Sequence, residues 1–264
     1  MNDYPFILIT GIGVMLLLFT SFLFVFITTQ RKKLKYQQDM QQLRETQQNQ
    51  LIEAAIRSEE IERHRIAETL HDEVGAILSS SKLHIQAIKA ESLDKQDRQL
   101  HEKGMELLNE GIQKVRGISH NLHSSILKEF GLNEAIRHFV NNLSRESVLK
   151  TSTELDDTYT TKNAENDISI YRMAQELLNN IMKHSGAKEI KISSVFKDDA
   201  LTMTIFHDGA GLSQQQFEEF RYKKEGLGLK NIQNRIILLK GKIDFHTTFQ
   251  DNRIIIFIPV NTSI

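Results

Sequence analysis

The stretch of sequence that decides the fold lies at residues 176–185 and reads E-L-L-N-N-I-M-K-H-S. It closes a predicted helix over 167–184, on which four polar residues recur at positions i, i+4, i+7 and i+8. That spacing places them on one face of the helix. They are Glu176, Asn180, Lys183 and His184. The apolar residues between them, which we predict to point toward a sheet, are Leu177, Leu178 and Ile181.

A polar helix face is most often only solvated, but these four side chains have the chemistry of a phosphate site. The amide oxygen of Asn180 suits Mg²⁺, and the carboxylate of Glu176 can order the waters of that ion. Lys183 and His184 can meet phosphate oxygens. This helix face therefore predicts a site for ATP.

A glycine-bearing turn downstream supplies the missing part of that site. The sequence G-L-G-L spans 226–229, and a helix is predicted from Leu227 to Leu239. Gly226 and Gly228 permit close approach of the backbone, and the N-terminal N–H groups of the helix can face an anion. A lone G-x-G is weak, but its place downstream of the polar helix strengthens the prediction.

The rest of the C-terminal half alternates helices and strands. A helix is predicted from Gly131 to Ser144, and 189–196 with 200–207 is predicted to form a hairpin that turns at Asp198-Asp199. The remaining predicted strands are 148–155, 242–248 and 253–260. Helices segregated over a mostly antiparallel sheet make a two-layer α+β domain.

Two long helical patterns precede that domain and predict a helical hairpin. In each, residues recur at alternating spacings of three and four, which is typical of a helix packed against others. The first set is Ala67, Leu70, Val74, Ile77, Ser81, His84 and Ile88, and the second is Leu100, Gly104, Leu107, Gly111, Val115, Ile118 and Leu122. The polar segment 91–98 separates the two sets. A lone hairpin buries too little apolar surface to be stable, so we expect a homodimer in which two hairpins form a four-helix bundle.

His71 lies beside the first of these patterns, in the sequence E-T-L-H-D-E at 68–73. It follows Leu70 directly, so its imidazole is predicted to lie at the solvent edge of the bundle. A histidine there is most often a plain surface residue. Asp72, however, can accept a hydrogen bond from one ring nitrogen and raise the nucleophilicity of the other. His71 and Asp72 are therefore the predicted catalytic pair.

The N-terminus is predicted to span a membrane. No residue from Pro5 to Thr29 is charged, and the 22 residues from Phe6 to Ile27 would extend about 33 Å as a helix, enough for a hydrocarbon core of roughly 30 Å. Four basic residues follow between 31 and 35. The positive-inside rule then predicts a single pass of the inner (cytoplasmic) membrane with the catalytic part in the cytoplasm. On this interpretation about four residues lie outside, and no extracellular sensor domain is expected.

Composition limits the other classes of function. The formal net charge of −1 gives no reason to expect direct nucleic-acid binding. The sequence holds no cysteine, which excludes a disulfide framework, a thiolate metal site and a cysteine nucleophile. Residues 36–66 contain no proline or glycine and are predicted to continue the membrane helix.

With these motifs in this order, the chain resembles sensor histidine kinases, in the branch with a short H-D phosphoacceptor motif typified by nitrate-sensor-like and fluidity-sensor-like kinases. The resemblance covers roughly residues 60–264. It rests on His71-Asp72, the N-box through Asn180, D-G-A-G at 208–211 and G-L-G-L at 226–229. The segment S-S-I-L-K-E-F-G-L at 124–132 looks like the connector between phosphoacceptor bundle and ATPase domain.

The resemblance implies a multidomain chain that uses ATP and Mg²⁺ and passes the phosphoryl group to the aspartate of a response-regulator protein. The transmembrane anchor at 1–30 and the helical linker at 31–60 follow from the patterns above. The resemblance implies a dimerisation and histidine phosphoacceptor domain at 61–127 and an ATP-binding domain of the gyrase-like GHKL type at 128–264. The implied nucleotide-binding residues are Glu176, Asn180, Lys183, His184, Asp208, Gly209, Gly211, Gly226, Leu227, Gly228 and Leu229, with Asn180 as the metal ligand. The loop 212–225 is the implied ATP lid, anchored by Phe217 and Phe220.

Two positions depart from the family's pattern. In the family, an aspartate two residues before the first glycine of G-x-G binds the adenine amine, and His207 occupies that position here. Asp208 lies one residue later, and we expect it to take this role through a local shift, so that Asp208→Ala lowers affinity more than His207→Ala. The second departure is Ala76, where family members that dephosphorylate their regulators carry Gln or His.

The sequence leaves two other functions open. One is a GHKL serine kinase of the anti-sigma-factor type, against which the bundle carrying His71 argues. The other is a membrane-tethered dimer that binds nucleotide without turnover. Acid-labile, base-stable phosphate on His71 would distinguish a histidine kinase from both.

Overall fold

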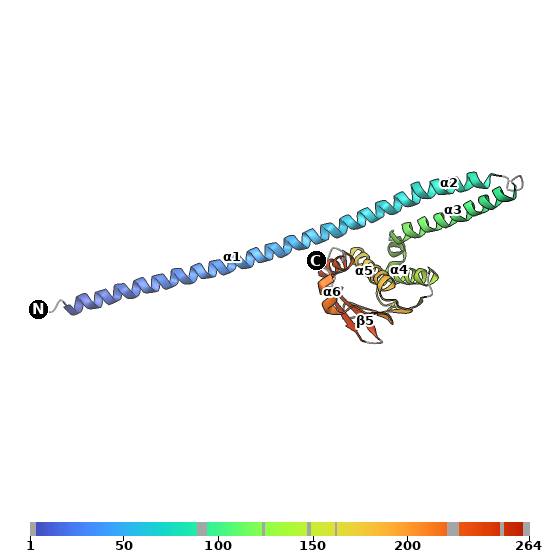
Figure 1. Cartoon of the computed structure of the whole chain (residues 1–264). Helices are drawn as coiled ribbons and strands as arrows, with labels where there is room; N and C mark the ends of the chain where they lie inside the picture. The colour runs from blue at the N-terminus through green and yellow to red at the C-terminus, as the bar shows by residue number, and fades with distance from the viewer. Residues whose placement is uncertain are drawn as a thin grey trace. The chain divides into compact units, whose positions relative to one another are not determined.

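A computed structural model describes residues 4–88, 94–122, 125–146, 149–161, 163–220, 227–248 and 251–260. The chain divides into two units, Met1–Ile52 and Glu53–Ile264, and helix α1 (Tyr4–Thr69) runs through the boundary (Figure 1). In the first unit, every side chain from Gly11 to Ile27 is exposed. Within the described residues, the helix that contains this stretch is the one long and apolar enough to cross a membrane.

The second unit begins with the predicted helical hairpin. The end of α1 passes through a π-helical turn, η1 (Leu70–Val74), into α2 (Gly75–Gln86), and α3 (Lys95–Leu122) packs back along them. Ser119 Oγ donates a 2.9 Å hydrogen bond to the Ala67 carbonyl, and a ring nitrogen of His101 lies 3.0 Å from the Ile85 carbonyl. Part of the predicted polar separator at 91–98 lies outside the described residues.

The buried face of α3 differs from the predicted one by a single position. Ile112 and Ser119 are buried, each one residue beyond the predicted Gly111 and Ile118. Several residues of the two predicted sets remain 49–65% exposed in this chain: Ile77, Ile88, Leu100, Leu107 and Ile118. The physical reason is that one hairpin covers only one side of each helix, so the neighbouring apolar side stays open.

A glycine redirects the chain between the hairpin and the α+β domain. Helix α4 (Ser125–Glu146) is interrupted at Gly131, whose backbone has φ 80° and ψ 179°. Glycine adopts positive φ without the steric penalty that a Cβ would bring. The helix after Gly131 matches the predicted helix, and it buries Leu132, Ile136 and Val140. Ser124, at the start of the expected connector, lies outside the described residues.

Five strands form one sheet in the order β1-β2-β3-β5-β4. They are β1 (Lys150–Glu154), β2 (Glu189–Lys197), β3 (Ala200–His207), β4 (Lys242–Thr247) and β5 (Asn252–Pro259). β1 pairs with β2 in parallel and the other pairs are antiparallel, which confirms the mostly antiparallel prediction. The predicted hairpin turns at Asp198 and Asp199, whose φ values of 51° and 54° suit a two-residue type I′ turn.

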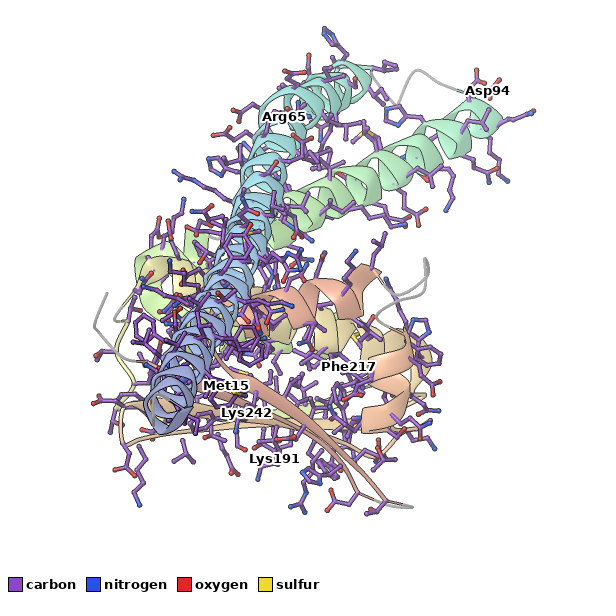
Figure 2. All side chains as sticks on the ribbon, turned by 90° about the vertical axis from the view of Figure 1, so that its left-hand side faces the viewer. Met15, Arg65, Asp94, Lys191, Phe217 and Lys242 are labelled. Carbon is purple, nitrogen blue, oxygen red and sulfur yellow. The ribbon has the colours of Figure 1, made fainter. Side chains whose placement is uncertain are left out.

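Helices cover one side of this sheet, as Figure 2 shows. They include α5 (Ala164–His184) and α7 (Leu227–Leu238), which contact each other. The side chain of Asn163 caps α5 by accepting hydrogen bonds from the next turn, at 2.8 Å from the Glu165 nitrogen. This arrangement is the predicted two-layer α+β domain.

A short helix occupies part of the segment that we predicted to be loop. Helix α6 (Gln214–Phe220) lies within 212–225, and residues 221–225 lie outside the described residues. Phe217 is 1% exposed and stacks on Phe245, with ring centroids 4.7 Å apart. The anchor role predicted for Phe217 thus has a structural basis, although the surrounding backbone is helical.

We expect Gly209→Ala to lower the free energy of unfolding by about 1–3 kcal/mol, because overpacking has no cheap relief here. A Cβ at Gly209 would lie 2.6 Å from the Ser185 carbonyl oxygen and 2.7 Å from the Ala187 nitrogen, both backbone atoms. Gly117→Ala is the control, since a Cβ there meets nothing within 4 Å, and a gain of about 0.5–1 kcal/mol is expected in a helix. Urea denaturation followed by circular dichroism would measure the stability of both variants. Equal denaturation midpoints for Gly209→Ala and Gly117→Ala would contradict this packing.

Candidate functional site

A cavity of about 560 Å³ lies between α5, the end of β3, α6 and the start of α7. Its volume is in the usual range for small-molecule sites. Polar and apolar residues from six elements line it, among them Glu176, Leu177, Asn180, Ile181, His184, His207, Gln216, Phe220, Gly228, Leu229, Phe245 and Ile254. The structure therefore brings together the predicted polar helix and the predicted glycine turn, which are separated by about 50 residues of sequence.

Oxygen-bearing side chains gather where α5 meets the start of α7. The Asn180 amide nitrogen lies 3.5 Å from Glu176 Oε1, a weak contact that leaves the amide oxygen of Asn180 for a cation. A Cβ on Gly228 would lie 1.8 Å from the same Glu176 oxygen. Glycine at 228 thus lets the positive end of α7 approach the carboxylate closely. Leu229, as predicted, also lines this cavity, whereas Gly226 lies outside the described residues.

Lys183 does not line this cavity, unlike the other three members of the predicted polar stripe. Each residue advances an α-helix by about 100°, so Asn180 and His184 lie about 40° and 80° to one side of Glu176 and Lys183 about 20° to the other. The cavity lies on the side of Asn180 and His184. Lys183 faces a second cavity that borders the end of α1. Helical spacing therefore predicts which side of α5 meets the cavity but not where the cavity-lining face ends.

The glycines after β3 act in different ways. Gly211 lines the cavity, and a Cβ there would lie 2.1 Å from Asn252 Oδ1. Gly209 does not line the cavity and instead packs against the end of α5. Leu227 is 66% exposed and also lies outside the cavity lining. Of the residues predicted in the two glycine-bearing segments, Gly211, Gly228 and Leu229 line the cavity.

The structure places His207 rather than Asp208 at the cavity, against our expectation. Asp208 Oδ1 accepts hydrogen bonds from the backbone N–H groups of Lys188 and Glu189, at 2.7 and 2.9 Å. These amide donors, that of Glu189 foremost, hold the pKa of the Asp208 carboxyl below its usual range. His207 is 3% exposed, lines the cavity and has a lowered pKa because burial disfavours its charged form. The carboxylate is thus occupied by the start of β2, and the imidazole is left facing the site.

The sequence did not predict the apolar walls of the cavity. Leu177 and Ile181, which we predicted to point toward the sheet, are buried and also line the cavity. Phe245 and Ile254 come from β4 and β5, where simple alternation marks them as core residues with no signal of a site. Phe220, predicted as a lid anchor, lines the cavity as well.

His71 lies on the hairpin and outside this cavity. Its side chain is 72% exposed, as predicted, and its Nδ1 lies 2.7 Å from Asp72 Oδ1. The pair is carried on η1, whose wider turn is closed by a hydrogen bond from the Gly75 N–H to the Leu70 carbonyl. Such π-helical turns inside α-helices are frequently found at functional sites. Nothing in the sequence predicted this turn.

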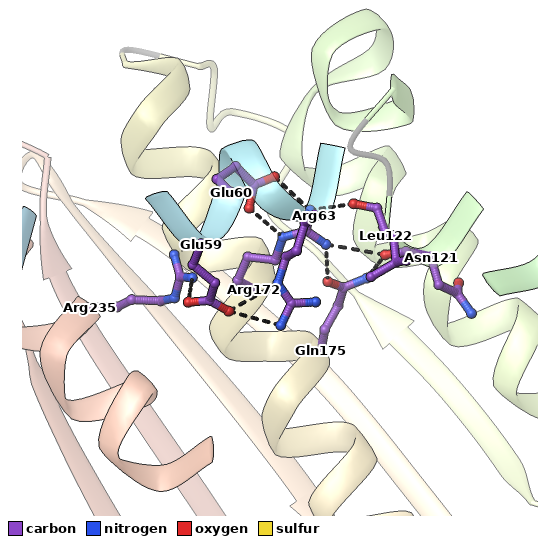
Figure 3. Close-up of polar contacts among 8 residues, drawn as sticks. All are labelled: Glu59, Glu60, Arg63, Asn121, Leu122, Arg172, Gln175 and Arg235. Atoms are coloured by element: carbon purple, nitrogen blue, oxygen red, sulfur yellow. Dashed lines mark hydrogen bonds and ion pairs between the residues drawn. The ribbon is translucent and has the colours of Figure 1, made fainter. Parts of the chain in front are cut away.

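A charge cluster of two buried arginines and two half-buried glutamates joins α1 to the α+β domain (Figure 3). Arg172 on α5 has a side chain 4% exposed and binds Glu60 through two hydrogen bonds, of 2.6 and 3.0 Å. It also donates to the carbonyls of Asn121 and Leu122, at 3.2 and 2.7 Å. Those carbonyls end α3, so Arg172 caps that helix with a positive charge as well as pairing with Glu60.

A second arginine makes a weaker contact in the same cluster. Arg235 on α7 has a side chain 3% exposed and donates one 2.9 Å hydrogen bond to Glu59, and its buried Nη1 has no partner in the described structure. Burial lowers the pKa of the Arg235 guanidinium, and the charges of Glu59 and Glu60 oppose that shift. For Glu60, burial acts to raise the carboxyl pKa, but Arg172 and the neighbouring arginines outweigh it and the pKa is lowered.

Two family comparisons match these two parts of the chain. A family described as "Histidine kinase" matches residues 62–127, which contain the hairpin with His71. A family described as "Histidine kinase-, DNA gyrase B-, and HSP90-like ATPase" matches residues 165–262, which contain the cavity. The chain belongs to the histidine kinases.

Relatives of this histidine kinase include named bacterial sensors. Sensor histidine kinase MctS of Rhizobium johnstonii is 28% identical over 193 residues, covering 72% of this chain and 41% of that protein. The kinase/phosphatase UhpB of Salmonella typhimurium is 26% identical over 208 residues, covering 76% and 39%. Sensor protein VraS of Staphylococcus aureus is 28% identical over 178 residues, covering 67% and 49%. The chain therefore spans less than half the length of these relatives.

The chain also shows weak similarity to solved structures of histidine kinases. The histidine kinase domain of a blue-light activated kinase from Erythrobacter litoralis is 12% identical, with a TM-score of 0.45, covering 70% of this chain and 96% of that one. Histidine kinase AdeS of Acinetobacter baumannii is 18% identical, with a TM-score of 0.41, covering 74% and 98%.

We expect Glu60→Gln to loosen the contact between α1 and the ATPase domain of this kinase. The change removes the charged acceptor of a buried arginine, an interaction worth about 1.5–3 kcal/mol. Because the chain has no cysteine, spin labels on Arg57→Cys and Lys230→Cys, both exposed in the structure, would report the distance between α1 and α7. A single narrow distance is expected for the labelled parent and a broad one for the Glu60→Gln variant.

The same distance should depend on pH in a defined direction. The lowered pKa of Glu60 means that its contribution is present above the usual value of 4.5 and is lost as the pH falls through the lowered pKa. Broadening is therefore expected only below about pH 4.5, and labelled chains diluted with unlabelled chains would remove distances between copies. Broadening already at pH 6 would contradict the assigned role of Glu60.

Proposed function

We propose that this chain is a membrane-anchored sensor histidine kinase that phosphorylates His71 with Mg²⁺-ATP and passes the phosphoryl group to an aspartate of a response regulator. The observation that carries the proposal is the presence, in one chain, of a nucleotide-sized cavity with oxygen ligands and an exposed histidine oriented by a carboxylate. Relatives named as sensor kinases support the same activity.

His71 is proposed to act as the nucleophile through Nε2. In the neutral imidazole, a proton on Nδ1 would satisfy the 2.7 Å contact with Asp72 and would leave the Nε2 lone pair free. Nε2 would attack the γ-phosphorus of ATP in line, and the bond from phosphorus to the β,γ-bridging oxygen would break as ADP leaves. Asp72 would hold the Nδ1 proton and stabilise the positive charge that develops on the ring.

The polar end of the cavity is proposed to hold the phosphates. The residues present fit such a group, because the Asn180 amide oxygen has no partner among the described residues, Glu176 lies beside it and the start of α7 supplies backbone N–H groups near Gly228. A bound Mg²⁺ would neutralise phosphate charge during transfer. Asn180 would be its protein ligand, with Glu176 ordering its waters and His184 contacting the phosphates.

Two chains are proposed to form the complete bundle. The exposed apolar residues Ile77, Leu107 and Ile118 lie on the hairpin, and a second hairpin would cover them. His71 does not line the cavity, and it lies about 17 Å along the helix beyond Glu60, which is bound to α5. Phosphorylation therefore requires either that the charge cluster opens or that the ATPase domain of the second chain reaches His71.

The apolar stretch of α1 is proposed to cross the inner membrane once. Its uncharged length and the basic residues that follow it support this topology, and by the positive-inside rule the ATPase domain would lie in the cytoplasm. The signal would then reach His71 through α1, because the helix is continuous from the apolar stretch to η1.

Phosphorylation of the purified full-length chain with γ-labelled ATP tests the proposal. We expect acid-labile, base-stable label on the parent, none on His71→Gln with nucleotide binding retained, and loss of both binding and label for Asn180→Ala. Asp72→Asn should slow labelling by about 10²-fold, the lower range for a general base, without changing ATP affinity. Acid-stable label on serine of a partner would favour the serine-kinase alternative, and binding without any label would favour the non-catalytic one.

We also predict that this kinase has little phosphatase activity. Ala76 is exposed and lies about one turn beyond His71, where a methyl group cannot hold the water that attacks a phosphoaspartate. The decay of a phosphorylated regulator should be nearly the same with and without the parent chain, whereas the Ala76→Gln variant should accelerate it. Strong acceleration by the parent would show that this chemistry needs no side chain at position 76.

A further inference from the structure

Two buried polar atoms lie unpaired where β3 ends and β5 begins, and one of them belongs to His207, which lines the cavity. His207 on β3 and Asn252 on β5 are direct partners in the strand register, and they are 3% and 4% exposed. His207 Nδ1 and Asn252 Oδ1 have no hydrogen-bond partner among the described residues. The amide nitrogen of Asn252 is already used, since it donates a 2.6 Å hydrogen bond to the Gly209 carbonyl. One ring nitrogen and one carbonyl oxygen are thus left for something else.

Leaving such atoms unpaired is unfavourable, which points to a ligand. A buried polar atom without a partner destabilises a protein, so two such atoms on neighbouring strands point to a partner that a bound ligand would supply. His207 itself lines the cavity, and Gly211 beside Asn252 lines it too. A side chain in place of Gly211 would collide with Asn252 Oδ1, at 2.1 Å.

The position of this pair along the cavity identifies the part of a nucleotide that it would face. The cavity follows α5 from Glu176 to His184, a rise of about 12 Å. His207 pairs with Ile190, which comes just after α5 ends, so it lies at the His184 end of that path. With the phosphates at Glu176 and Gly228, the nucleobase would lie at His207, between the apolar walls of Phe245 and Ile254.

The chemistry of these two side chains differs from that of a carboxylate. A carboxylate can only accept hydrogen bonds, so it favours the amino group that adenine carries at C6 and repels the carbonyl that guanine carries there. A neutral imidazole accepts or donates at Nδ1 according to its tautomer. Burial disfavours the charged form of His207, although the nearby Asp208 partly offsets this effect on its pKa.

We propose that His207 and Asn252 read the six-position edge of the purine with uncharged groups, so that the site accepts both 6-amino and 6-oxo purine nucleotides. The inference rests on the proposed function, in which this cavity binds a nucleotide. His207 is the residue that sets the specificity: as an acceptor at Nδ1 it takes the adenine amine, and as a donor it takes the guanine carbonyl. Asn252 Oδ1 adds an acceptor for an amino or ring N–H group of either base.

Equilibrium binding of non-hydrolysable ATP, GTP and ITP analogues to the full-length chain with Mg²⁺ tests this proposal. ITP has the carbonyl of GTP without its 2-amino group, so it isolates the effect of the six position. The three dissociation constants are expected to agree within about tenfold, which corresponds to 1.4 kcal/mol. His207→Asp is expected to weaken GTP and ITP at least tenfold relative to ATP, because a buried carboxylate would face the carbonyl.

A matched control separates this effect from a general change of charge. His246→Asp makes the same substitution at an exposed histidine of β4 outside the cavity lining, and it should leave the ratio of the three constants unchanged. A parent chain that binds ATP more than about 100-fold tighter than GTP and ITP would overturn the inference while leaving the proposed function intact. These dissociation constants are measured on the parent chain, so the test remains valid even if His207→Asp does not fold. Failure of all three nucleotides to bind would overturn the proposed function and this inference with it.

Discussion

The arrangement of the catalytic parts depends on the pairing of Arg172. Its guanidinium is almost fully buried, and a buried charge is tolerated only when it is paired and hydrogen-bonded. Its partners come from three places: Glu60 on α1, Gln175 on α5 and the terminal carbonyls of α3. One side chain of the ATPase domain therefore joins α1, α5 and the end of α3.

The two halves of this charge cluster are unequal. Arg172 satisfies its donors with several acceptors, whereas Arg235 makes one hydrogen bond to Glu59 and leaves Nη1 unpaired. The α5 side is thus bound more firmly to α1 than the α7 side. Since α5 carries Asn180 and Glu176, while α7 carries Gly228 near its start, the cluster lies on the two helices that border the proposed phosphate end of the cavity.

Close backbone approach explains why small residues recur around the cavity. Gly228 leaves room for the Glu176 carboxylate, Gly211 for the Asn252 amide and Gly209 for the end of α5. These contacts tie the segment after β3 and the start of α7 to the same helix. In the proposed function, this geometry holds the phosphate end and the base end of one nucleotide at a fixed separation along α5.

The sequence by itself determined the order of elements and the polar residues that α5 presents to the candidate site. Helical spacing put Glu176, Asn180 and His184 on one face, the Asp198-Asp199 turn marked the hairpin, and the H-D pair marked His71, because all of these are patterns between neighbours in the chain. The tertiary structure decided which residues lie next to each other in space. It placed Lys183 beyond the edge of the cavity, engaged Asp208 with the start of β2, left His207 facing the site and paired Arg172 with Glu60, 112 residues away. The buried face of a side chain and its polar partners are set by long-range packing, which leaves no periodic trace in the local sequence.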